Sequence, residues 1–238
     1  MKKIILTFLS IGLFQIGFSQ KLFDAIENQG FEKVQKLVEK GADVNMQKEN
    51  GFNPLFSACA QGNKDIAVFL INKGAKVNFA LKNGITPLHI TAQNGYYDIA
   101  LMLIEKGADI NIQDANLWTP LRFAARNGRF DIVKLLVDKG SKLDIRAEDK
   151  STPMANAVWK GHFDIVKFLL EKGANVNIQD KDNETPVMYA IYKGQMEILK
   201  LLLKYNPDLT LKNNDKKTAL EVAENQGQPA MVKLLLEQ

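Results

Sequence analysis

The chain has 238 residues, of which 46% are hydrophobic and 24% are charged, and its formal net charge is +4. This composition is typical of an ordinary soluble protein with enough apolar surface for a sizeable core. The net charge is too small to indicate a nucleic-acid-binding protein, which would concentrate basic residues on one face.

The first 19 residues have the layout of a secretory signal peptide. Lys2 and Lys3 form a basic start, an apolar run covers residues 4–18, and the small residues Gly17 and Ser19 precede a suitable cleavage site. The apolar run is shorter than the roughly 20 residues that a membrane-spanning helix requires. We therefore expect cleavage of a signal peptide, export to the periplasm or the exterior, and no stable membrane insertion of the mature chain. A retained membrane anchor is the alternative.

A period of 33 residues runs through the rest of the chain, in three independent series. The prolines of the first series are Pro54, Pro87, Pro120, Pro153 and Pro186. The glycines of the second are Gly62, Gly95, Gly128, Gly161, Gly194 and Gly227. The third comprises Gly41, Gly74, Gly107, Gly140 and Gly173. Such self-similarity indicates an array of equivalent structural units.

Each period predicts two short helices followed by a reversal of the chain. In the period that begins at residue 114, Thr119 is a suitable N-cap and Pro120 fits the first helical turn. Gly128 favours the left-handed backbone that ends this helix, and a second helix is expected before Gly140. Isolated helices of this length are marginal in water, so the pairs must stack on one another to bury their apolar residues.

The segment 83–111 contains the letters TPLH and GADIN, and it resembles an ankyrin repeat. The resemblance extends over residues 21–238, which is essentially the whole mature chain. It implies an all-α fold, an ankyrin-repeat solenoid of stacked helix pairs with short hairpin fingers, and about seven repeats including two caps. We expect a single domain, 20–238, after a signal peptide, 1–19. The expected repeats are 21–48, 49–80, 81–113, 114–146, 147–179, 180–212 and 213–238.

The sequence offers little that indicates catalysis or metal binding. The single cysteine, Cys59, lies in an apolar helical stretch, and the two histidines, His89 and His162, occupy non-equivalent positions of different repeats. The resemblance assigns His89 a structural hydrogen bond within its TPLH segment. Recurrent Asn and Asp residues at the repeat step are explained by bonds to nearby backbone in turns. We expect no catalytic residue, no metal site and no cofactor, and no convergence of titratable groups.

The resemblance also implies a partner-binding face, formed by the finger tips and the first helix of each repeat. The residues of this face are those two positions before each proline and those just before each loop glycine. From these positions the predicted partner-binding residues are Phe52, Trp118, Arg126, Trp159, Lys160, Tyr192 and Lys193. Trp, Tyr and Arg are enriched among binding hot spots, and the two lysines suggest a partner with an acidic patch. The alternative is that the rings pack on adjacent fingers and stiffen the array.

The sequence therefore predicts a non-catalytic scaffold for protein–protein interaction, monomeric and exported. A narrower alternative is a regulator or protector of an exported enzyme or toxin, in an inhibitor or immunity-like role. A hidden hydrolase that uses Asp, Glu or His is the third hypothesis, and the absence of nucleotide-binding and metalloprotease motifs argues against it.

Overall fold

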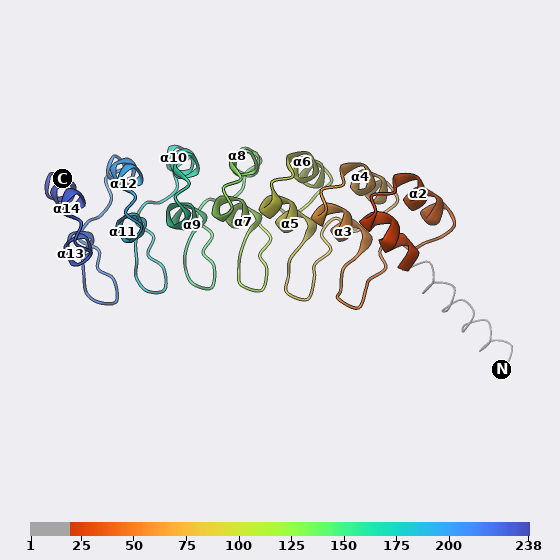
Figure 1. Ribbon diagram of the computed structural model, residues 1–238, viewed down its shortest axis with the longest axis horizontal. Helices are drawn as coiled ribbons and strands as arrows, with labels where there is room; N and C mark the ends of the chain where they lie inside the picture. Colours follow the sequence, from red (N-terminus) through yellow and green to blue (C-terminus); the bar gives the residue numbers. More distant parts are fainter. Residues whose placement is uncertain (1–19) are drawn as a thin grey trace. The chain divides into compact units, whose positions relative to one another are not determined.

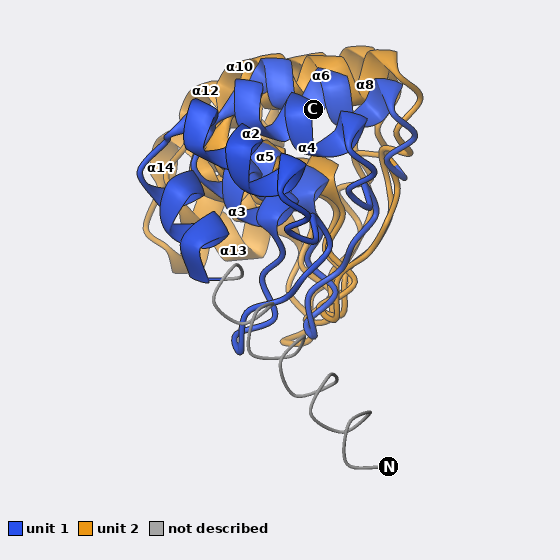
Figure 2. Cartoon of the chain, turned by 90° about the vertical axis from the view of Figure 1, so that its right-hand side faces the viewer, with its two compact units in different colours: residues 1–91, 96–109 blue, residues 92–95, 110–238 orange. Residues whose placement is uncertain are grey.

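The computed structural model describes residues 20–238; the predicted signal peptide, residues 1–19, lies outside the described part. All regular elements between residues 20 and 238 are helices, and no strand is present in that range. No helix in this part of the chain is both long and apolar enough to cross a bilayer. The chain divides into two compact units, of which unit 1 comprises residues 1–91 and 96–109, and unit 2 comprises residues 92–95 and 110–238 (Figure 2).

Unit 1 contains the first helix pairs of the array. Residues 20–27 are helical and precede the labelled elements. The labelled helices are α2 (Phe31–Glu39), α3 (Pro54–Ala60), α4 (Lys64–Asn72), α5 (Pro87–Asn94), whose last three residues belong to unit 2, and α6 (Tyr97–Glu105). Cys59 is fully buried in α3, and this burial raises the pKa of its thiol. The structure thus confirms that Cys59 is a buried packing residue.

Unit 2 contains four complete helix pairs, which Figure 1 shows as two parallel rows with a finger beside each pair. The first helix of each pair, here called an inner helix, lies next to its finger, and the second is called an outer helix. The inner helices are α7 (Pro120–Arg126), α9 (Pro153–Lys160), α11 (Pro186–Tyr192) and α13 (Ala219–Asn225). The outer helices are α8 (Phe130–Asp138), α10 (Phe163–Glu171), α12 (Met196–Leu203) and α14 (Pro229–Leu236).

The inner helices begin where the sequence predicts. The Oγ1 atoms of Thr119, Thr152 and Thr185 each accept a hydrogen bond from the backbone N–H three residues later, at 3.2 Å. At the start of α13, Thr218 and Glu221 form a reciprocal capping box. These bonds satisfy donors that the first helical turn leaves free, and they fix the point at which each finger turns into a helix.

The fingers of unit 2 are joined to one another through their backbones. The amide of Glu148 donates to the carbonyl of Asn116 at 3.0 Å, and Lys181 donates in the same way to Asp149 at 2.8 Å. Within a finger, the amide of Asp180 donates to the carbonyl of Glu184 at 3.0 Å, which closes a hairpin-like loop. The finger side chains are therefore held in a fixed register from one repeat to the next.

The recurrent Asn and Asp residues have a structural role, but they bond to the next repeat rather than to their own turn. The Oδ1 of Asn111 accepts a hydrogen bond from the amide of Lys142 at 2.9 Å, and Asn177 accepts one from Asp208 at 2.8 Å. In unit 1, Asn45 accepts from Lys76 at 2.9 Å. Each side chain spans 31 residues, so these bonds connect neighbouring repeats and reinforce the stacking.

Candidate functional site

Unit 2 has a hollow of about 670 Å³ between three consecutive fingers and the inner helices α9 and α11. The fingers contribute Asp149 and Ser151, then Asp180, Asp182 and Glu184, and finally Asn213, Asn214 and Asp215. The helices and their ends contribute Arg126, Ala155, Asn156, Trp159, Tyr189, Tyr192 and Lys193. Each group comes from equivalent positions of successive repeats, so the backbone bonds between fingers fix the spacing of the lining.

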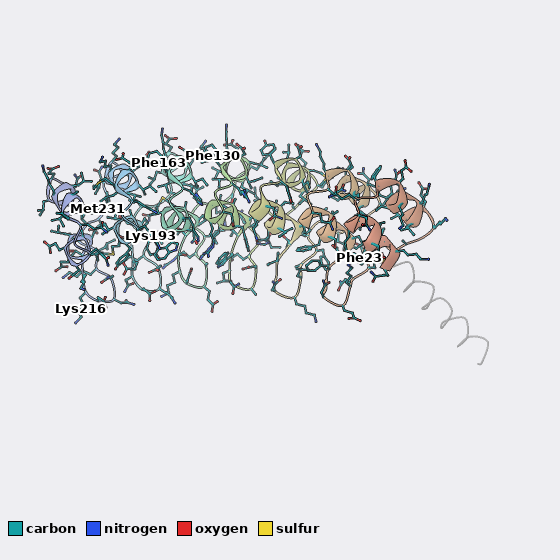
Figure 3. All side chains as sticks on the ribbon, viewed as in Figure 1. Phe23, Phe130, Phe163, Lys193, Lys216 and Met231 are labelled. Carbon is teal, nitrogen blue, oxygen red and sulfur yellow. The ribbon has the colours of Figure 1, made fainter. Side chains whose placement is uncertain are left out.

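Four of the predicted binding residues line this hollow, namely Arg126, Trp159, Tyr192 and Lys193. The indole of Trp159 is 40% exposed, packs edge-on against the ring of Tyr189 at 5.2 Å, and has the Lys193 ammonium 3.6 Å from its centroid. In Figure 3, Lys193 lies beside the row of inner helices, whereas Phe130 and Phe163 lie beside the outer row. The ring of Trp159 is thus held on one side and available on the other.

The other three predicted residues do not line the hollow. Trp118 packs inside its own repeat, with the guanidinium carbon of Arg122 4.2 Å from its ring centroid and the ring of Phe123 at 5.2 Å. Lys160 is exposed at the end of α9, outside the lining. Phe52 belongs to unit 1 and packs against Phe56 at 4.7 Å. The alternative of internal packing therefore describes Trp118 and Phe52 better than a free binding surface does.

A buried ion pair beside the hollow was not predicted. Arg122 is only 2% exposed, and its Nη1 and Nη2 donate to the two carboxylate oxygens of Asp149 at 2.9 and 2.7 Å. Nη1 also donates to the carbonyl of Ser151 at 3.2 Å, while Nε is buried without a hydrogen-bond partner. Burial raises the pKa of Asp149, but the bonds from Arg122 and Ser151 outweigh it and lower that pKa to about 2.

The sequence contained a signal for Arg122 that the analysis did not use. Arg122 occupies the position that His89 has in the TPLH segment one repeat earlier. His89 is fully buried, and its Nδ1 accepts from the backbone N–H of Thr86 at 3.1 Å, as the family resemblance implied. A basic side chain in a slot that is buried in the preceding repeat requires a buried partner, and this requirement is met by Asp149.

The acidic side chains at the base of the hollow are already hydrogen-bonded to different degrees. Asp180 is buried and accepts from the amides of Asp182 and Glu184, both at 2.8 Å, and from the hydroxyl of Tyr189. Glu184 accepts from the hydroxyl of Tyr192 at 2.8 Å through Oε1, but its Oε2 is buried without a hydrogen-bond partner. Asp180 is therefore fully used by the fold, whereas Glu184 keeps an unsatisfied acceptor.

Burial and neighbouring charge both act on these groups. The pKa of Glu184 is raised, first by burial and then by the negative charges of Asp180 and Asp182, although its hydrogen bonds to Tyr192 and Asn213 oppose the shift. Burial, together with the bond to Glu184, raises the pKa of Tyr192 to about 12. The tyrosine hydroxyls consequently act as hydrogen-bond donors at neutral pH, and negative charge in the hollow is poorly compensated.

The charge of the lining differs from the expectation. Five carboxyl side chains and only two basic ones line the hollow, and the two basic groups, Arg126 and Lys193, lie over the rings of Trp118 and Trp159. The expectation that titratable groups would not converge was wrong for the carboxylates. The expected acidic patch on the partner was inferred from Lys160 and Lys193, and the lining favours the opposite sign.

The histidines and the cysteine take no part in the hollow. His162 makes a hydrogen bond of 3.1 Å between its Nε2 and the carbonyl oxygen of Arg126, and Cys59 lies in unit 1. Among residues 20–238 there is no group of three or more His, Cys, Asp or Glu side chains arranged to hold a metal ion. What the arrangement offers chemically is recognition, by aromatic faces, hydroxyl donors and carboxylate acceptors.

Repeated helix pairs with stacked fingers and an open polar hollow define a helical-repeat protein. The chain belongs to the ankyrin repeat family, because the family model for ankyrin repeats (3 copies) matches residues 22–114, 112–180 and 173–238. It is similar to the crystal structure of the human ASB11 ankyrin repeat domain, with 28% identity and a TM-score of 0.78, over 85% of this chain and 90% of that one. A comparison with curated proteins gives no match.

These findings confirm the predicted fold class, an all-helical ankyrin-repeat solenoid. Repeats of this family generally mediate protein–protein interaction, and the fold is typically a non-catalytic scaffold.

Proposed function

We propose that this chain is a non-catalytic scaffold that binds a partner protein through the fingers and inner helices of unit 2. The observation that carries the proposal is the hollow, which places the half-exposed indole of Trp159 among hydrogen-bonding groups on fixed fingers. Aromatic residues in such positions are the side chains most often found at binding hot spots. The protein is proposed to act as a monomer, because one copy supplies the whole lining.

Replacing Trp159 and Tyr192 together by alanine should weaken capture of the partner by about 100-fold, since a hot-spot residue contributes about 2 kcal/mol or more to binding. The experiment uses the immobilised mature chain and the exported protein fraction, with the affinity of the recovered partner then measured by titration. Tyr205→Ala is the matched control, because Tyr205 has a similarly exposed ring (37%) outside the hollow. Equal capture by the double variant and by the control would contradict the proposal.

Export is a separate proposal that rests on the basic start and short apolar run of residues 1–19. Fractionation of the producing cells should place the protein in the periplasm or the medium. Amino-terminal sequencing of the recovered chain should begin at Gln20. Recovery from the cytoplasm of a chain that still begins with Lys2 or Met1 would rule out the cleaved signal.

A role as regulator or protector of an exported enzyme or toxin is compatible with the same surface. It would be favoured if mixing the captured partner with this chain changed the activity of that partner.

A further inference from the structure

The array contains an arginine slot that is filled in one repeat and empty in the next. Arg122 projects from an inner helix and binds the carboxylate of Asp149 on the following finger through two hydrogen bonds. One repeat later, 33 residues along, the corresponding positions are Ala155 and Asp182. Both of these residues line the hollow. The small side chain of Ala155 therefore leaves space where the preceding repeat holds a guanidinium group.

The carboxylates around this empty slot lack cationic partners. The side chain of Asp182 makes no hydrogen bond or ion pair with any residue between 20 and 238, and the buried Oε2 of Glu184 has no hydrogen-bond partner in that range. Asp215, at the equivalent position of the next finger, also lines the hollow. A buried acceptor without a donor is costly, so a donor that enters the hollow would be strongly favoured.

We propose that the hollow binds the guanidinium group of an arginine on the partner protein, in the position that Arg122 occupies one repeat earlier. This inference rests on the proposed function and names the chemistry of its partner. The carboxylate of Asp182 would receive the guanidinium as Asp149 receives Arg122, with Glu184 as the second acceptor.

Arginine fits this site better than the other candidate groups. A guanidinium is planar, presents donors that match a carboxylate in pairs, and stacks on aromatic rings such as that of Trp159. A lysine ammonium carries the same charge but lacks the paired donor geometry. Phosphate groups or acidic segments would be repelled by the five carboxyl side chains of the lining.

The test is a titration of the mature chain with N-acetyl-arginine amide, followed by the NMR signals of the Trp159 and Trp118 indole N–H groups. We expect a saturable shift at Trp159 and at most a small shift at Trp118. The amides of N-acetyl-lysine and N-acetyl-citrulline are the comparison ligands, and citrulline keeps the shape of arginine without its charge. Citrulline amide should bind at least about tenfold more weakly, because hydrogen bonds to charged groups contribute about 1.5–3 kcal/mol.

Two variants make the test specific to the slot. Ala155→Arg supplies an internal guanidinium, and Asp182→Asn removes the principal carboxylate; each should weaken binding of arginine amide at least about tenfold. Asp182 is exposed, so its substitution leaves the core intact even if Ala155→Arg does not fold. The control is Glu171→Gln, which removes an exposed carboxylate on the outer helix α10, outside the hollow.

The outcomes separate this inference from the proposed function. Equal affinities for arginine and citrulline amides, no saturable shift at Trp159, or unchanged binding by Asp182→Asn would each overturn the arginine site. If partner capture is lost in the Trp159 and Tyr192 variant but persists in Asp182→Asn, the binding surface stands and the arginine does not. If neither variant changes capture, the surface itself is wrong.

Discussion

Replacing Asp149 by alanine is expected to lower the free energy of unfolding by about 3 kcal/mol, because it leaves the buried guanidinium of Arg122 without its principal partner. The amide and hydroxyl of Ser151 also lose an acceptor, at 3.0 and 2.8 Å. In a domain of this size such a loss corresponds to a fall in Tm of roughly 8 °C. Circular dichroism at 222 nm during heating measures the change directly.

The control for this prediction is the removal of both charges. Arg122→Met keeps an apolar stem in the buried slot and eliminates the unpaired Nε, so combining it with Asp149→Ala should recover most of the lost stability. If the double variant were as unstable as Asp149→Ala alone, a buried unpaired charge would not be the cause of the loss.

The same ion pair predicts a dependence on acid. Folding lowers the pKa of Asp149 from its ordinary 3.8 to about 2, so its contribution to stability is complete above pH 4 and is lost as the pH falls toward 2. The full shift would correspond to roughly 2.5 kcal/mol. Because the Asp149 side chain is 42% exposed, solvent screening reduces this to about 1 kcal/mol. The stability difference between wild type and Asp149→Ala should therefore narrow over this interval.

Replacing Gly128 by alanine is expected to destabilise the fold by about 2–3 kcal/mol, and two causes add together. The residue has a φ of +70°, a conformation that costs about 1 kcal/mol for a side chain with a Cβ. A Cβ at this position would also lie 2.8 Å from Cε1 of His162, so the imidazole would have to move and release the carbonyl oxygen of Arg126. Urea unfolding curves of the two proteins measure the difference.

Gly194→Ala is the matched control for this substitution. Gly194 occupies an equivalent loop with a φ of +64°, but nothing lies within 4 Å of the Cβ that it would carry. It should therefore cost only the backbone contribution of about 1 kcal/mol. Equal costs at the two positions would show that the contact with His162 is unimportant.

The fold could be predicted from the sequence because its information is local and repeated. The threonine caps and the loop glycines each act within a few residues, and the 33-residue step places them again in every repeat. The division into two compact units was not predicted. It depends on packing between repeats, which the period does not contain.

The candidate site could be predicted only in part. Trp159, Tyr192 and Lys193 were located because their positions in the repeat place them on the finger and inner-helix face. The sign of the charge was not, because it depends on acidic residues from three fingers that converge only after folding. Trp118 was misinterpreted as free because its ring is covered by Arg122, whose burial depends on Asp149, 27 residues away.

The alternation of arginine and alanine at one slot has a consequence for how such arrays diversify. A repeat that carries its own guanidinium is closed to cations, whereas a neighbour with alanine at the same place is open, although both share one backbone. Gain or loss of a recognition pocket then requires a single codon change and no remodelling of loops. Duplication followed by such exchanges would let a lineage shift its binding preference along the array while the architecture is inherited intact.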